Sequence, residues 1–272
     1  MLTVLRSGFI RTVIFCYVLL VGFWFWIYTT GNTDAQPSYI FGTIYPFLAI
    51  AGGVAALTYS KRWGGWKSVM GKGIIFLGLG LFGEAFGQFV WSYYNLIVQD
   101  VAPYPSIADI GYFSIIPFYS IAMLKFARAS GARFSLQDYL NKIQVVIIPI
   151  VMLVLSYVFF LRDYELDLSA PIKTFLDFGY PMGEAVMISI AILTFTLSRK
   201  FLGGVMKAKI LYIIFAFIVQ YVTDYTFLYK VNAETYVNGG IVDLMYATSF
   251  AIMAIGIAMI GEGSMYNKEG TV

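Results

Sequence analysis

Histidine is absent from this chain of 272 residues, and cysteine occurs once, as Cys16. Without histidine there is no His-based catalysis, no haem ligation by His and none of the usual zinc sites. A single cysteine cannot form a disulfide within the chain. Pairs of aspartates remain as catalytic groups in principle, but the sequence contains no recognisable nucleophile–base set. We therefore expect that the protein is not an enzyme.

Charge is also scarce, because Asp, Glu, Lys and Arg make up 12% of the residues, against about 25% in globular proteins. Apolar residues make up 60% and fall in runs of roughly 20 residues, the length at which a helix crosses a bilayer. Strands of a barrel would alternate over shorter segments. The runs span residues of about 12–30, 38–59, 73–97, 107–124, 143–161, 174–198, 210–229 and 240–261.

These runs predict an all-α, polytopic membrane protein with eight transmembrane helices in a single integral-membrane domain over residues 1–272. Gly83 and Gly87 form a small-xxx-small step in the third run, which we expect to serve close packing of helices. The lipid bilayer is the first partner that this fold implies.

The positions of Lys and Arg predict the orientation of the helices. With eight spans, both termini lie on one side, together with the loops after the second, fourth and sixth spans. That side holds all but three of the 18 Lys and Arg residues, the exceptions being Arg162, Lys173 and Lys230. We expect both termini in the cytoplasm, the chain in the cell membrane and its basic loops near anionic lipid. The net charge of +3 then reflects this topology, so we expect no nucleic-acid partner.

Similar residues recur in the same order at an offset of about 132–136 positions, which indicates an internal duplication. Each half, about 1–135 and 136–272, would hold four helices. Because four is even, the halves would share one orientation, as a parallel repeat rather than the inverted repeat of many transporters. The alternative is chance similarity between helices rich in Tyr and Phe. The matches pair Tyr45-Pro46 with Tyr180-Pro181, Gln88 with Gln220, Tyr104 with Tyr236, Asp109 with Asp243 and Tyr112 with Tyr246.

Several carboxylates lie inside the predicted spans, where an unpaired charge is costly. Helical spacing places Gln88 and Trp91 on the same face as Glu84. Lipid cannot pair with such faces, so we expect them to turn inward and to form a polar, aromatic-lined centre that opens toward the outer side. The acidic residues within the spans are Glu84, Asp109, Asp177, Glu184, Asp224 and Asp243.

Two roles stay open for these acids. Asp109 and Asp243 lie near helix starts, where a carboxylate caps a helix or accepts a Tyr hydroxyl from a neighbour. Glu84 and Glu184 lie too deep to cap a helix, and there a carboxylate suits proton coupling or recognition of a cation. No metal site is expected, and the sequence indicates no particular cofactor. The predicted ligand-binding residues are Glu84, Gln88, Trp91, Asp109, Tyr112, Asp177, Tyr180, Glu184, Asp224 and Asp243.

Segments 91–94 and 103–112, the second of which reads P-Y-P-S-I-A-D-I-G-Y, resemble the multipass N-terminal membrane sensory domain of bacterial diguanylate cyclases and histidine kinases. Segment 180–184 resembles a Y-P-x-G-D element of that domain, with Glu184 in place of Asp, and Gln88 stands where an acid is expected. The resemblance covers about residues 40–260 and implies a ligand-sensing membrane module. In that family an output domain follows, whereas here a short polar tail follows the last run, so we expect a separate signalling partner.

Three hypotheses of different kinds follow. The first is a non-catalytic membrane module, a sensor or a subunit of a membrane complex, that binds a ligand from the outer side. The second is a small-solute or proton-coupled transporter, with Glu84 and Glu184 as coupling groups. The third is a structural accessory subunit whose carboxylates pair internally or with the helices of a partner.

Overall fold

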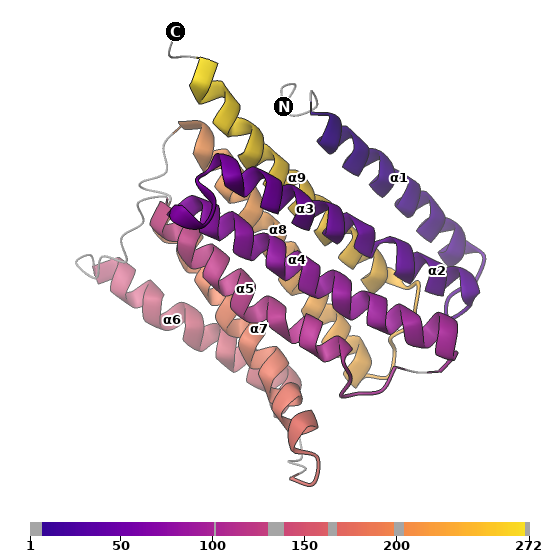
Figure 1. Cartoon of the computed structure of the whole chain (residues 1–272). Helices are drawn as coiled ribbons and strands as arrows, with labels where there is room; N and C mark the ends of the chain where they lie inside the picture. The colour runs from indigo at the N-terminus through magenta and orange to yellow at the C-terminus, as the bar shows by residue number, and fades with distance from the viewer. Residues whose placement is uncertain (1–6, 101, 130–138, 163–167, 199–203, 270–272) are drawn as a thin grey trace.

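The computed structural model of the chain describes residues 7–100, 102–129, 139–162, 168–198 and 204–269. Every regular element in these ranges is helical. Figure 1 shows the helices lying side by side, with α1 on one flank and α6 on the other. Eight helical spans in the described residues are long and apolar enough to cross a membrane. The chain is therefore an all-α, multipass membrane protein, as its sequence predicts.

Each predicted run corresponds to one of these spans, and the ends differ by a few residues. The third span covers Val69–Val98 against a predicted 73–97, and the fourth covers Ala108–Ala129 against 107–124. Single turns of π-helix, η3 (Tyr94–Val98) and η4 (Tyr157–Leu161), extend α4 and α6. The helices are α1 (Gly8–Thr29), α2 (Gln36–Ile44), α3 (Pro46–Arg62), α4 (Val69–Tyr93), α5 (Ala108–Ala129), α6 (Tyr139–Ser156), α7 (Pro171–Ser198), α8 (Gly204–Asn232) and α9 (Ile241–Glu269).

The second span consists of two helices because Pro46 starts a new helix, α3, directly after α2. Proline lacks a backbone N–H and its fixed φ suits the first turn of a helix. Pro181, its partner in the predicted repeat, instead lies inside the continuous helix α7. The carbonyl oxygen of Pro181 accepts a hydrogen bond of 2.8 Å from Ser156 Oγ on α6. The two prolines therefore differ in local structure although their sequence surroundings match.

Glycines bring α4 and α5 into close contact. A Cβ atom added to Gly111 on α5 would lie 2.5 Å from the carbonyl oxygen of Gly83 and 2.7 Å from the backbone nitrogen of Gly87. One added to Gly80 would overlap the ring of Tyr119. Small residues at such contacts let membrane helices pack backbone against backbone. The small-xxx-small step of Gly83 and Gly87 therefore lies in a helix interface, as predicted.

The helices of the two predicted halves interlock. Within the halves, α4 packs on α5 and α8 on α9, and across them α3 packs on α9 and α7 on α5. We expect this pairing for two halves in one orientation, but the duplication itself stays a prediction. Large side chains such as Tyr45, Tyr119 and Phe217 are fully buried between these helices.

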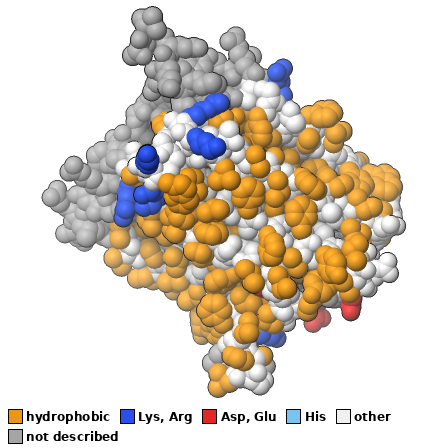
Figure 2. Space-filling model, viewed as in Figure 1, with side chains coloured by type: hydrophobic (Ala, Val, Ile, Leu, Met, Phe, Trp, Pro, Cys, Tyr) orange, Lys and Arg blue, Asp and Glu red, His pale blue; other side chains and the backbone are white. Residues whose placement is uncertain are grey.

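The two ends of the bundle differ in charge. The N- and C-termini lie toward the same end in Figure 1, and Figure 2 shows Lys and Arg gathered at that end, beneath which apolar side chains cover the flank. We call the other end, formed by the connections after α1, α4 and α8, the distal end. Which side of the membrane each end faces stays a prediction. Of the cations predicted to be cytoplasmic, Arg6, Arg133, Arg199 and Lys200 lie outside the described residues.

Candidate functional site

Three carboxylates from different helices lie in the interior of the bundle, and we call them the carboxylate cluster: Glu84 on α4, Glu184 on α7 and Asp224 on α8. The side chains of Glu84 and Glu184 are 2% exposed and that of Asp224 is 8% exposed. All three are buried, so the packing of α4, α7 and α8 turns them away from lipid. The inward orientation predicted for these residues is therefore what the structure has.

Gln220 on α8 links two members of this cluster, Glu84 and Asp224. Its Nε2 donates to Glu84 Oε1 at 2.7 Å and to both carboxylate oxygens of Asp224 at 3.1 Å. Its Oε1 accepts a bond of 2.5 Å from Ser249 Oγ, and Tyr246 donates its hydroxyl to Asp224 Oδ1 at 2.9 Å. One amide group with two hydrogens thus serves three carboxylate oxygens. Glu84 and Asp224 thus belong to one hydrogen-bonded network with side chains of α8 and α9.

Glu184 is the member of the cluster that has a buried oxygen without a hydrogen bond in the described part of the chain. Its Oε2 is buried and accepts no hydrogen bond from the described residues, although Glu184 interacts electrostatically with Asp224 and Glu84. The bonds that the described structure gives to Glu84 and Asp224 come from neutral amide and hydroxyl groups. Like charges in a poorly polarisable interior repel one another. Neutrality of the cluster therefore needs protons or a cationic ligand group.

The geometry does not favour a metal ion in that role. In the ranges that the structure describes, no group of three or more His, Cys, Asp or Glu side chains is arranged to hold one. A cation that brings its own N–H donors needs no such convergence, because each donor can reach a separate oxygen. An ammonium-type group is thus the better match to the cluster.

Asp109 and Asp243 serve as helix caps. Asp109 accepts the backbone N–H of Ser106 at 2.6 Å and the hydroxyl of Tyr180 at 2.7 Å. Asp243 accepts the backbone N–H of the residue four positions earlier at 2.6 Å and the hydroxyl of Tyr236 at 2.9 Å. In each carboxylate, one oxygen therefore accepts a backbone N–H at the start of the helix and the other accepts a tyrosine hydroxyl. This supports the structural alternative for both residues, and their role in ligand binding stays a prediction.

Replacing either cap by alanine is expected to lower the free energy of unfolding by about 2 kcal/mol, since a cap bond and a tyrosine bond are lost together. Asp243→Ala should cost more than Asp109→Ala, because Asp243 is 3% exposed and Asp109 is half-buried. Denaturant unfolding in detergent micelles, followed by circular dichroism, measures both. Glu234→Ala, an exposed change at the distal end, is the control and should cost under about 0.5 kcal/mol. Losses no larger than this control would contradict the capping role.

The other predicted residues form separate pairs. Tyr112 donates its hydroxyl to Gln88 Oε1 at 3.0 Å, between α5 and α4. Tyr104 donates its hydroxyl to Asp177 Oδ1 at 2.7 Å, at the distal end. The structure thus places members of the predicted set in the carboxylate cluster, in two helix caps and in these pairs, and their common role as a ligand site stays a prediction.

A cavity of about 870 Å³ opens at the distal end, and we call it the distal pocket. Its volume is within the range of about 300–1,000 Å³ that is usual for small-molecule sites. Trp91 is the one member of the predicted set that lines it. Three segments form its wall: the connection after α1 with the start of α2, the end of α4 with η3, and the connection between α8 and α9. The lining residues are Asp34, Gln36, Tyr39, Trp91, Asn95, Leu96, Gln99, Asp100, Val231, Glu234, Tyr236 and Asn238.

Hydrogen bonds of Asn238 join these three segments. Its backbone N–H and its Nδ2 donate to Asp34 Oδ1 at 2.8 and 2.9 Å, and its carbonyl oxygen accepts the N–H of Asp34 at 3.0 Å. Its Oδ1 accepts Trp91 Nε1 at 3.2 Å. Burial, with the nearby Asp243 carboxylate as a further cause, raises the pKa of the Tyr236 hydroxyl well above its usual value, so this wall residue stays neutral.

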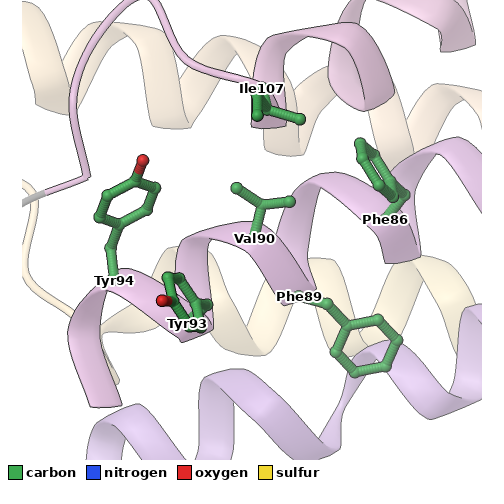
Figure 3. Close-up of a pocket in the computed structure, with 6 residues that line it drawn as sticks. All are labelled: Phe86, Phe89, Val90, Tyr93, Tyr94 and Ile107. Atoms are coloured by element: carbon green, nitrogen blue, oxygen red, sulfur yellow. The ribbon is translucent and has the colours of Figure 1, made fainter. Parts of the chain in front are cut away.

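A second hollow, of about 330 Å³, lies on the outward face of α4 near the start of α5 and is drawn in Figure 3. Its lining is apolar except for the hydroxyls of two tyrosines, and it carries no charged side chain. An apolar lining of this kind is what a lipid-facing surface presents. It therefore lies outside the candidate site. The lining residues are Phe86, Phe89, Val90, Tyr93, Tyr94 and Ile107.

Comparison of the chain with protein-family models, with curated proteins and with solved structures finds no match.

Proposed function

We propose that this chain is a non-catalytic membrane module that binds a positively charged ligand group from its distal end. It acts as a sensor or as the ligand-binding subunit of a membrane complex. The observation that carries this proposal is the carboxylate cluster, which has three buried acidic side chains within the spans, two of them bonded to neutral donors. An acidic side chain in that position marks a functional site more often than a packing contact.

A purely structural role accounts less well for the cluster. Asp109 and Asp243, which have structural roles, each accept hydrogen bonds at both carboxylate oxygens. Glu184 differs, because its buried Oε2 lacks a donor among the described residues. A buried oxygen without a hydrogen bond lowers the stability of the fold, so a purely structural contact would not be expected to contain one. A bound ammonium-type group would supply the missing donor and offset the negative charge.

The sensor form of the proposal rests on the resemblance of segments 91–94 and 103–112 to bacterial sensory domains. In this form of the proposal, a separate signalling partner carries the output. Co-purification of a stable partner in a fixed ratio would favour a subunit over a free-standing sensor.

The unpaired Glu184 oxygen would also serve a proton-coupled carrier, which is the second candidate function. Proteoliposomes that hold the purified protein distinguish the two. A carrier shows solute flux that depends on the proton gradient and is lost in Glu84→Gln, whereas a binding module shows binding without flux.

Methylammonium chloride is expected to raise the Tm of the protein in detergent above its value in NaCl at equal ionic strength. Occupation of one site at a hundredfold excess over Kd stabilises by about 2.7 kcal/mol, or roughly 5–10 °C for a chain of this size. Glu184→Gln, which keeps the size of the side chain and removes its charge, should lose at least half of this increase.

Asp109→Asn is the matched control, because it neutralises a carboxylate within a span but outside the cluster. It should keep the methylammonium-dependent increase in full. Equal increases in Glu184→Gln and the unmodified protein, or no increase over NaCl in either, would contradict the proposed function.

A further inference from the structure

The walls of the distal pocket carry negative charge only. Asp34, Asp100 and Glu234 line it, and no Lys, Arg or His is among its lining residues. Asp34 uses Oδ1 for both bonds from Asn238, so Oδ2 makes no bond to the described residues. Glu234 lies on the connection after α8 with an exposed side chain. Charge of one sign around a cavity attracts a ligand of the opposite sign.

Aromatic rings form the inner part of the same pocket. Trp91 and Tyr236 stand edge to face, with ring centroids 6.4 Å apart and planes at 81°. The position of each ring is fixed by a hydrogen bond, from Trp91 Nε1 to Asn238 Oδ1 and from the Tyr236 hydroxyl to Asp243 Oδ1. Faces of Trp and Tyr attract cations through the charge distribution of the ring. Rings that are already held in place lose little freedom when a ligand binds.

The cation that this lining fits is organic rather than a metal ion. The three carboxylates line one cavity, yet no trio of acidic side chains in the described residues is arranged to hold a metal. The apolar side chains of Leu96 and Val231 complete the wall beside the rings. Carbon atoms of an organic cation can contact them, whereas a hydrated metal ion gains nothing from them.

We propose that the distal pocket binds a small organic ammonium ion, with the charged group between Glu234, Asp34 and the ring of Trp91. This inference rests on the proposed function, in that it names the ligand class and the place where the ligand first meets the protein. Its own evidence is the lining of the pocket, so its test can fail while the proposed function stands. A quaternary ammonium head is the form that tests it best, because such a group binds through charge and ring faces without N–H donors.

The test is titration calorimetry of the full chain in detergent with choline, and with 3,3-dimethylbutan-1-ol as its neutral isostere. Choline should bind and the isostere should not. Trp91→Leu should raise the Kd of choline by about 10-fold, in line with a partly desolvated cation–π contact. Glu234→Gln should raise it by about 3-fold, in line with an exposed ion pair. Trp66→Leu is the matched control: Trp66 is 59% exposed on the connection between α3 and α4, at the other end of the bundle, and its loss should leave the Kd unchanged.

Equal binding of choline and its isostere, or equal Kd values in Trp91→Leu and Trp66→Leu, would overturn the pocket proposal. Glu234→Gln replaces an exposed side chain and should fold normally, which keeps the test valid if Trp91→Leu does not fold. Absence of choline binding together with methylammonium stabilisation that needs Glu184 overturns the pocket and leaves the proposed function standing. Choline binding that needs Trp91, without any effect of Glu184, supports the pocket and contradicts the role of the cluster.

Discussion

Gly111→Val is expected to abolish the packing of α4 on α5 and to leave little folded protein after extraction in detergent. The first added atom alone would lie 2.5 Å from the carbonyl oxygen of Gly83 and 2.7 Å from the nitrogen of Gly87. Both are backbone atoms of a helix, so no change of rotamer relieves the overlap. Overpacking by side chains costs about 1–3 kcal/mol, and we expect at least about 3 kcal/mol where the obstacle is backbone.

Gly22→Ala provides the control for this prediction. Gly22 is also inside a helix, α1, but an added Cβ atom meets nothing within 4 Å. This change should keep or raise stability, by up to about 1 kcal/mol, because alanine favours the helix more than glycine. Size-exclusion profiles and thermal unfolding of both variants measure the difference. A Gly111→Val protein that is as monodisperse and as stable as Gly22→Ala would contradict the close packing of α4 on α5.

Gln220→Leu is expected to lower the free energy of unfolding by about 3 kcal/mol, although leucine has nearly the same volume. Gln220 is 1% exposed and donates to Glu84 and Asp224 while it accepts from Ser249. Its loss leaves Glu84 without its bond at 2.7 Å and removes the acceptor of Ser249. Denaturant titration in micelles, with the slope compared between variants, gives the change in stability.

A double-mutant cycle tests whether this cost arises in the cluster. Glu84→Leu combined with Gln220→Leu removes both partners of the bond, so the two costs should not add, and the shortfall should exceed about 1 kcal/mol. Asp109→Ala combined with Gln220→Leu joins changes without a shared partner, and these costs should add. Additive costs in both pairs would show that Gln220 acts through its packing alone.

The spans could be predicted because the length of an apolar run depends on the bilayer and not on the fold. The ends were less well defined, since the third span begins four residues before its run and the fourth ends five residues after its run, in residues that pack against neighbours. The same local reasoning treats the matched prolines alike, yet Pro46 begins α3 while Pro181 lies within α7. Tertiary contacts, such as the bond from Ser156 to the Pro181 carbonyl, are not visible in a sequence.

The candidate site was predictable in part for a similar reason. Helical spacing shows which residues share a face, and so it placed Gln88 and Trp91 with Glu84. It does not show which face meets which, and Gln220 contacts Glu84 across 136 positions of sequence. The distal pocket was missed because Asp34 and Asn238 lie in connections without periodicity, and they meet across 204 positions. The signal that could have found them is the group of polar residues that follow the ends of the spans on one side.

The contacts of α1 have a consequence for the order of biosynthesis. Its Tyr17 hydroxyl bonds to Thr248 Oγ1 on α9 at 2.8 Å, and its Trp24 Nε1 donates at 2.9 Å to the carbonyl oxygen of Gly240, directly before α9. The ribosome makes α1 first and α9 last. Until α9 has been inserted, these two groups of α1 lack the partners that they have in the folded protein. A chain whose synthesis stops before α9 therefore cannot form either hydrogen bond.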